Sequence, residues 1–230
     1  MRAIKYSGYC FFIVLSIAIL FSCTKMDDGY KDFIKDGEII YTGRVDSVKT
    51  YPGNNRILLS MLLLSDPKIS TVKVYWNNKA DSAVKNVVRS AGADTVYFML
   101  NNMAEGSYPF EIYTYDNNKH SSVKTESIGI SYGQNYINSL FNRSLKSVTY
   151  SASKATLKWF GPSSQTVGQQ ISYIDSLGVA KTVFAAKADT MTILNNFKRL
   201  DFFQYKTLYK PDANALDTFY TTSSQSVQVL

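Results

Sequence analysis

A short segment recurs in similar form later in the same chain, and this repeat restricts the folds that the chain can adopt. Residues 93–102 read ADTVYFMLNN and residues 188–196 read ADTMTILNN, so the two copies lie about 95 residues apart. Upstream of each copy, residues 59–61 (LSM) are echoed by residues 157–159 (LKW), and a proline turn follows both segments. A period this long is typical of tandem domains rather than of a solenoid. The sequence therefore predicts two copies of one domain.

The segments between the turns have the composition of β-strands. Short runs rich in Val, Ile, Tyr, Phe and Thr alternate with turn clusters such as residues 52–55 and 116–118, and no segment sustains an apolar stripe of helical period. Many short strands at this spacing are typical of sandwiches. We therefore expect an all-β chain with two tandem β-sandwich domains, residues 38–130 and 144–230, joined by a linker at residues 131–143.

The first residues resemble a bacterial lipoprotein signal. Two basic residues precede an apolar run at residues 9–21, which is interrupted only by Ser16, and Cys23 follows it. This run is too short to span a bilayer, which takes ~20 apolar residues, and it fits a secretory signal peptide. The cysteine at the expected cleavage point resembles a lipobox, so we expect residues 1–22 to be removed, Cys23 to be lipidated and residues 23–37 to form a tether. An uncleaved anchor followed by an unrelated cysteine is the alternative.

The residues after Cys23 bear on where the anchored protein faces. The segment Lys25-Met26-Asp27-Asp28 resembles the acidic export signal of Bacteroidota lipoproteins. That resemblance implies a protein that is lipid-anchored in the outer membrane and faces the cell exterior, with the membrane as its partner through the anchor. Aspartate is common at flexible termini, so a periplasmic orientation stays open.

The charge of the chain does not indicate a nucleic acid partner. Lys and Arg number 25 against 18 Asp and Glu, which gives a net charge of +7 and a pI near 9.2. The basic residues are scattered singly, and no run of five or more occurs. We therefore expect no nucleic acid partner and interpret the basic residues as a solvated surface; the alternative is mild attraction to acidic polysaccharide or to anionic lipid headgroups.

The residue types that most enzymes use are scarce. The only cysteines are Cys10 and Cys23, so once Cys23 is lipidated the exported chain has no thiol for a disulfide, a metal site or nucleophilic catalysis. The only histidine, His120, lies in a polar turn where we expect it to be solvent-exposed, and one loop histidine supports neither a zinc site nor a Ser–His–Asp relay. The sequence predicts no catalytic residues, no metal and no cofactor, and hence no enzyme.

Each copy of the repeat resembles a fibronectin type III or immunoglobulin-like domain. The segment 157–159 with Pro162 is similar to that family's second strand, whose tryptophan packs between the sheets, and Met61 takes the place of Trp159 in the first copy. Tyr108 occupies the position of the family's corner tyrosine. The resemblance implies tandem sandwiches and leaves the function open, since such folds host many functions.

A longer pattern resembles a specific family of Bacteroidota lipoproteins, domain of unknown function 4998. The similar segments cover nearly all of the exported chain: residues 51–56, 62–67, 74–78, 110–116, 205–211 and 217–220. Members of that family are often encoded beside polysaccharide-uptake machinery. The resemblance therefore implies polysaccharide and an outer-membrane transporter complex as partners, and it assigns no catalytic residues.

Strand alternation sorts the abundant aromatic residues into two faces. Along one expected strand Tyr108, Phe110 and Ile112 share a face, which leaves Glu111, Tyr113 and Tyr115 on the other. Along a neighbouring strand Val72, Val74 and Trp76 share a face, which leaves Lys73 and Tyr75 opposite. The candidate ligand-binding residues are therefore Tyr75, Tyr113, Tyr115, Glu111 and Lys73. Sugar rings stack on such aromatic faces; the alternative is that these tyrosines only pack across strands.

Two function classes follow from these observations. The leading hypothesis is a non-catalytic surface lipoprotein that binds glycan or assists a polysaccharide-uptake system. The alternative is a structural or docking subunit that makes only protein–protein contacts, with the exposed tyrosines as its interface.

Overall fold

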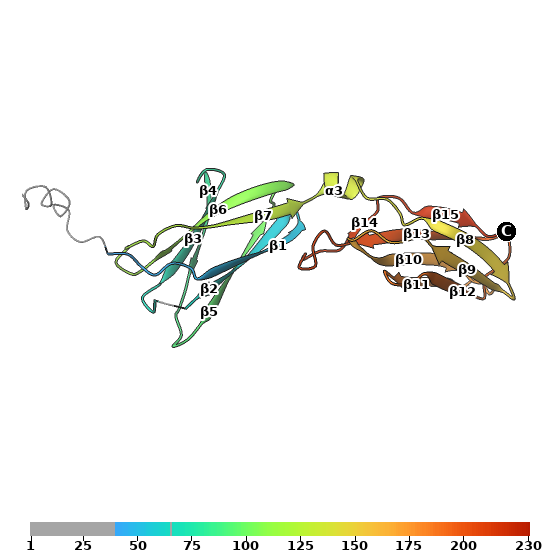
Figure 1. The fold of residues 1–230 in the computed structure, drawn as a ribbon, viewed down its shortest axis with the longest axis horizontal. Coiled ribbons are helices and arrows are strands. Elements are labelled where there is room, and N and C mark those ends of the chain that lie inside the picture. Colours follow the sequence, from blue (N-terminus) through green and yellow to red (C-terminus); the bar gives the residue numbers. More distant parts are fainter. Residues whose placement is uncertain (1–39, 65) are drawn as a thin grey trace, which may run out of the picture. The chain divides into compact units, whose positions relative to one another are not determined.

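A computed structural model describes residues 40–64 and 66–230 (Figure 1). The predicted signal peptide, Cys23 and the tether lie outside the described residues. The residues from Thr42 to Leu230 form one compact unit. In the part of the chain that the structure describes, no helix is long and apolar enough to cross a membrane.

Seven strands in the first half of this unit form a sandwich. They are β1 (Ser47–Asn54), β2 (Arg56–Leu63), β3 (Thr71–Trp76), β4 (Asp81–Asn86), β5 (Asp94–Asn101), β6 (Gly106–Tyr115) and β7 (Thr125–Tyr132). The strand order is β4-β3-β6-β7-β1-β2-β5, and every pair is antiparallel except β1 with β7. Strand β1 pairs with β2 over most of its length and with β7 through Gly53 and Asn54, so it passes from one layer to the other (Figure 1).

The first core lies between these two layers. Because successive side chains of a strand point to opposite faces, every second residue of β2 and β5 is buried, as it is in β3 and β6. The buried apolar residues of these four strands are Ile57, Leu59, Met61, Leu63, Val72, Val74, Val96, Phe98, Leu100, Phe110 and Ile112. Full burial of one such side chain contributes about 1.5–3 kcal/mol, so this core is the main source of stability for the sandwich.

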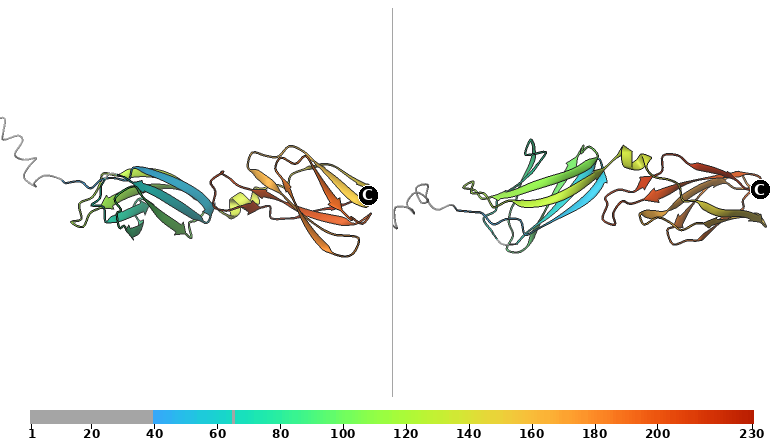
Figure 2. Two further views of the ribbon diagram at one scale, coloured as in Figure 1. Left: turned by 90° about the horizontal axis from the view of Figure 1, so that it is seen from below. Right: turned by 45° about the horizontal axis from the view of Figure 1, so that its top comes forward.

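The second half of the unit contains a further eight strands and a separate core. The strands are β8 (Leu145–Ser151), β9 (Lys154–Trp159), β10 (Thr166–Ile174), β11 (Ala180–Ala186), β12 (Met191–Asn195), β13 (Phe202–Tyr209), β14 (Phe219–Tyr220) and β15 (Gln225–Gln228). One sheet has the order β12-β9-β8; the other has the order β11-β10-β13-β14, with β15 also paired to β13. Figure 2 shows these strands, in yellow to red, from two further sides. Trp159, Phe197, Phe203 and Tyr205 are among the residues of the core between them. The predicted all-β sandwich fold is confirmed, whereas the predicted domain boundaries stay a prediction.

The two copies of the sequence repeat occupy corresponding places. The first copy contains β5, which pairs with β2, and the second contains β12, which pairs with β9. Both copies end at an asparagine with a left-handed backbone, Asn102 with φ 57° and Asn196 with φ 51°. Asparagine tolerates this conformation better than most residues, which explains the shared Leu-Asn-Asn ending.

The structure shows the roles of two residues noted in the sequence, Tyr108 and Trp159, and corrects the expected exposure of a third, His120. The hydroxyl of Tyr108 donates to the carbonyl of Ala104 over 2.9 Å, as expected of a corner tyrosine. Trp159 is buried and its Nε1 donates to Thr192 Oγ1 over 2.9 Å. His120 is not fully exposed as we expected: its side chain is 32% exposed, and Nδ1 lies 2.8 Å from a carboxylate oxygen of Asp116.

The predicted linker contains the short helix α3 (Gln134–Asn138). The carboxylate of Glu105 accepts hydrogen bonds from the backbone N–H groups of Asn135 and Tyr136, over 2.7 and 2.8 Å. These groups lack partners inside the helix, so Glu105 caps its first turn. Arg143, at the end of the predicted linker, is buried.

The close packing of β10 on β11 gives a first prediction, Gly168→Ala. Gly168 lies at a register shift of β10, and a Cβ there would collide with the backbone carbonyl of Ala185 and the ring of Phe184. We expect the free energy of unfolding to fall by about 2 kcal/mol or more, because the Ala185 carbonyl belongs to the paired strand and cannot rotate away. Gly161→Ala is the matched control, since no atom lies within 4 Å of its Cβ position. Equal urea midpoints for the two variants would contradict the prediction.

Candidate ligand-binding site

The five predicted site residues lie on the outward side of β3 and β6. In the antiparallel register of these strands, Lys73 is opposite Tyr113, Tyr75 is opposite Glu111, and Tyr115 is opposite Thr71. All five side chains are partly exposed, while the intervening residues of both strands are buried in the core. The structure thus brings together the whole set that strand alternation predicts.

The two central tyrosines contact each other and two lysines. The ring centroids of Tyr75 and Tyr113 lie 5.9 Å apart with an interplanar angle of 85°, an edge-to-face arrangement. The Nζ of Lys73 lies 4.5 Å from the Tyr75 centroid, and the Nζ of Lys79 lies 5.3 Å from the Tyr113 centroid. Both distances are in the range of cation–π attraction. The neighbouring Lys73 ammonium also lowers the pKa of Tyr75, whereas burial raises the pKa of Tyr115.

Lys79 links the aromatic and acidic groups of this face. Its Nζ lies 3.0 Å from Glu111 Oε2 and 3.3 Å from the hydroxyl of Tyr113, which in turn donates to the same carboxylate over 3.1 Å. Lys79, and after it Tyr113, holds the pKa of Glu111 below its ordinary value. Glu111 is therefore ionised at neutral pH and is not poised as the protonated acid that a glycosidase needs.

Sequence reasoning missed Lys79 because it lies in a turn outside the strand pattern. Asn77, Asn78 and Lys79 have φ values of 51°, 53° and 67°, and these left-handed residues form the tight turn between β3 and β4. The Asn77-Asn78 pair marks this turn in the sequence. One signal for Lys79 was available in the sequence: it directly follows this asparagine pair, just after the strand that carries Tyr75.

A second lysine neutralises paired carboxylates on β6 and β7. Glu111 and Glu126 are directly opposite each other in the antiparallel register, which is unfavourable for two like charges. The Nζ of Lys124 lies 2.6 Å from Glu126 and 3.8 Å from Glu111, so it is shared between them. In the described part of the chain, no group of three or more His, Cys, Asp or Glu could hold a metal ion.

A depression of about 360 Å³ adjoins this face. Its polar lining includes Glu111, Lys79 and Glu126, and its less polar lining includes Tyr75, Trp76, Pro109 and Ile128. Of the five predicted residues, Tyr75 and Glu111 line it, whereas Lys73, Tyr113 and Tyr115 lie beside it on the same sheet face. The arrangement offers ring surface, one ammonium and two carboxylates to a ligand.

The family described as domain of unknown function 4998 matches residues 23–219. The chain belongs to this family. No curated protein matches this member of domain of unknown function 4998.

Two solved structures similar to the chain contain tandem fibronectin type III domains. One is the segment of two fibronectin type III domains from chicken tenascin, with 12% identity and a TM-score of 0.33; the match covers 81% of this chain and 100% of that one. The other is the FN1–FN3 segment of chicken CNTN1, with 12% identity and a TM-score of 0.42; the match covers 84% of this chain and 67% of that one.

Proposed function

We propose that this chain is a non-catalytic binding protein and that the outward face of β3 and β6 binds a glycan. One observation carries the proposal: partly exposed tyrosine rings lie at and beside a depression that Lys79 and Glu111 line. The axial C–H groups of a sugar stack on an aromatic ring, while its hydroxyls take donors and acceptors from nearby polar side chains. An ammonium beside a carboxylate supplies both kinds of hydrogen-bonding group at one place.

The size of the depression bears on how much of a glycan would be bound. Sites that enclose small molecules have volumes of about 300–1,000 Å³, so a depression of about 360 Å³ is at the small end of that range. It suits one or two sugar units of a chain whose remainder crosses the sheet face over Tyr113 and Tyr115. Binding of this kind is modest per site, which fits a protein that captures polymer rather than one that retains a free small ligand.

We place this binding activity at the outer membrane. The anchor proposed is the lipid on Cys23, and the acidic residues Asp27 and Asp28 support exposure to the cell exterior. The family resemblance supports a role beside polysaccharide-uptake machinery, with an outer-membrane transporter complex as partner.

The test is a pair of tyrosine substitutions measured against a matched control. A soluble fragment beginning at residue 24 is first screened on a glycan array, and the best ligand is titrated by calorimetry. Tyr75→Ala plus Tyr113→Ala is expected to weaken its binding by about 1–3 kcal/mol, the scale for removing large buried side chains from contact.

The control is Tyr97→Ala, which removes an exposed tyrosine from β5 and is expected to leave the affinity unchanged. Equal affinity of the double variant and the wild type would move the site away from this face. Failure of every glycan on the array would refute glycan binding itself.

The docking alternative has one observation of its own. Ile128 and Ile130 on β7 are 67% and 44% exposed, on the strand that borders the depression. Neighbouring exposed isoleucines suit a protein surface better than they suit a sugar. If docking is the function, Ile128→Ser plus Ile130→Ser abolishes co-purification with an outer-membrane transporter in mild detergent, and the tyrosine substitutions leave it intact.

A further inference from the structure

Arg143 has a buried positive charge that forms no ion pair with a described carboxylate, and the negative charge of Asp189 acts on it only from beyond ion-pair distance. The residue is 6% exposed, and within residues 40–64 and 66–230 it forms no ion pair. Its Nε donates to the carbonyl of Phe160 over 2.7 Å, and its Nη1 donates to Gln169 Oε1 and to the carbonyl of Lys187 over 3.2 and 3.3 Å. All three acceptors are uncharged. A buried charge is normally paired, so this arrangement is incomplete as it stands.

Donors without acceptors surround the same position. Among the described residues, the Nη2 group of Arg143 has no acceptor, and it is not fully buried, so a ligand in solvent can reach it. Gln169 is completely buried, and its Nε2 also has no partner. The face of Trp159 lies 5.8 Å from the guanidinium carbon and supplies only a weak attraction for the charge. A group that accepts hydrogen bonds and carries negative charge would complete this arrangement at Nη2.

A depression of about 410 Å³ gives access to Arg143. It is lined by Arg143 together with hydroxyl and amide groups that include Ser144, Ser163, Gln165 and Thr166, and none of the lining residues described is acidic. The residues that line it therefore present no negative charge to a ligand. This depression is lined by none of the residues of the β3–β6 face.

The chain segment that carries Arg143 is held in place from β13. The hydroxyl of Tyr205 donates to the carbonyl of Arg143 over 2.8 Å, and the N–H of Arg143 donates to Thr207 Oγ1 over 2.8 Å. The hydroxyl of Tyr209 donates to the carbonyl of Phe141 over 2.5 Å. These bonds fix the backbone from which the guanidinium projects, so little ordering would be needed when a ligand binds.

We propose that this depression is a second ligand site, in which Arg143 binds an oxyanion group such as a carboxylate or a sulfate. The guanidinium fork matches two oxygens of such a group, and a charged hydrogen bond to it would satisfy the Nη2 donors. The site does not depend on glycan binding at the β3–β6 face. If both sites act on one polymer, the ligand is an acidic polysaccharide.

Tryptophan fluorescence gives a direct measurement of this site. The chain has two tryptophans, and Trp76→Phe leaves Trp159, next to Arg143, as the only one. The full chain with this substitution is purified in mild detergent and titrated at constant ionic strength with sodium D-glucuronate, with sodium sulfate and with uncharged D-glucose. We expect a saturable change in emission with glucuronate or sulfate and none with glucose.

Two further substitutions separate the site from general ion effects. Gly161→Phe has open space at its Cβ and adds a ring to the lining, so it is expected to fold and to weaken anion binding at least tenfold. Arg143→Lys, which keeps the charge but loses the fork, is expected to weaken it by a similar factor, while the exposed Arg199→Lys has no effect.

The outcomes assign the chemistry or reject the site. A response to glucuronate alone identifies a carboxylate ligand, a response to sulfate alone identifies a sulfated ligand, and responses to both identify an oxyanion site of broad specificity. No saturable response to either anion, or a response that Gly161→Phe leaves unchanged, overturns the proposal.

Discussion

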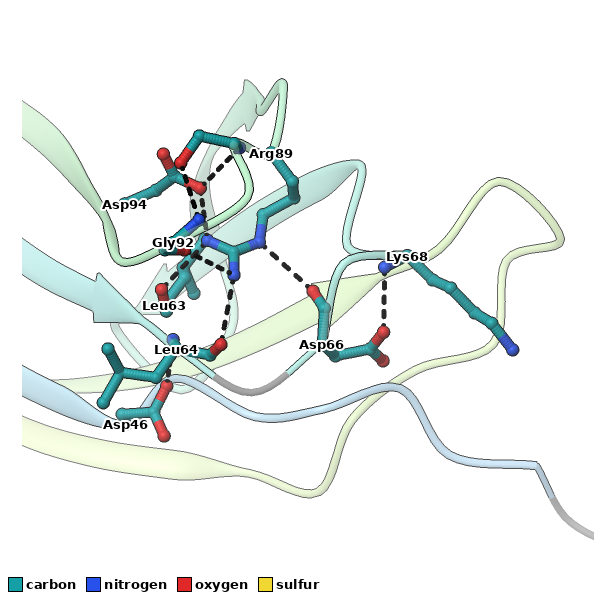
Figure 3. A network of polar contacts seen from close by, with 9 residues as sticks. Asp46, Leu63, Leu64, Asp66, Lys68, Arg89, Gly92 and Asp94 are labelled. Carbon is teal, nitrogen blue, oxygen red and sulfur yellow. Dashed lines mark hydrogen bonds and ion pairs between the residues drawn. The ribbon is translucent and has the colours of Figure 1, made fainter.

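Replacing Arg89 by methionine is expected to lower the free energy of unfolding by about 3 kcal/mol or more. The Arg89 side chain is only 5% exposed and lies among the ends of several strands of the first sandwich (Figure 3). Its Nη1 donates to the carbonyl of Leu63 over 2.9 Å and to Asp94 Oδ2 over 2.5 Å, and its Nε donates to the carbonyl of Asp66 over 3.2 Å. Methionine keeps the apolar stem and removes all of these donors. Each carbonyl left without a partner costs about 1–3 kcal/mol.

The control for this prediction is Arg44→Met. Arg44 is exposed in the same sandwich, and substitutions at exposed positions usually change stability by no more than about 0.5 kcal/mol. Urea unfolding followed by circular dichroism gives both values. If the two variants unfold at the same urea concentration, the Arg89 network shown in Figure 3 contributes nothing to stability and water replaces it without cost.

The strand faces of the first sandwich could be predicted from sequence because they depend on a local rule. Alternation along residues 108–115 separates Phe110 and Ile112, which are buried, from Glu111, Tyr113 and Tyr115, which are not. The repeat likewise predicted two copies of one domain, and the structure places its copies in β5 and β12, which pair with β2 and β9. Both signals come from side chains that follow one another in the chain, so the sequence is sufficient to find them.

Features that depend on backbone partners distant in sequence could not be predicted. In the sequence, Arg89 cannot be distinguished from a surface arginine, because it donates to backbone carbonyls, which every residue type has. The passage of β1 from β2 to β7 is set by pairing at Gly53 and Asn54, which no hydrophobic pattern marks. Prediction of a linker at residues 131–143 gave no sign that Arg143 is buried within the second half of the unit.

The candidate site shows the same division. Its five predicted residues could be found because alternation places them on one face of two strands. The resemblance to fibronectin domains implied that these two strands are adjacent. The groups that sequence reasoning missed come from a turn, from the residue just before β7 and from β7 itself: Lys79, Lys124 and Glu126. The depression itself is formed by side chains of β3, β6 and β7 together, so its existence depends on their packing and not on any one segment.

Replacing Cys23 by serine is expected to move the protein from the membrane fraction to the soluble fraction almost completely. Serine lacks the sulfur that receives the diacylglyceryl group, so the processing that follows is blocked. Each buried CH₂ of an acyl chain contributes about 0.8 kcal/mol, and anchors with two or more chains hold a protein stably on a membrane. Our proposal gives the chain no attachment to the membrane other than this lipid anchor. Fractionation and labelling with radioactive palmitate measure the two effects.

Cys10→Ser is the matched control, because Cys10 is the only other cysteine and lies within the predicted signal peptide. It is expected to leave both labelling and membrane attachment unchanged. The two variants also separate the two interpretations of the N-terminus. If Cys23→Ser abolishes labelling but the protein stays in the membrane fraction with residues 1–22 still attached, the apolar run at residues 9–21 retains it there in place of the lipid. If labelling persists in Cys23→Ser and is lost in Cys10→Ser, the lipidated residue is the other cysteine and the predicted boundary at residue 23 is wrong.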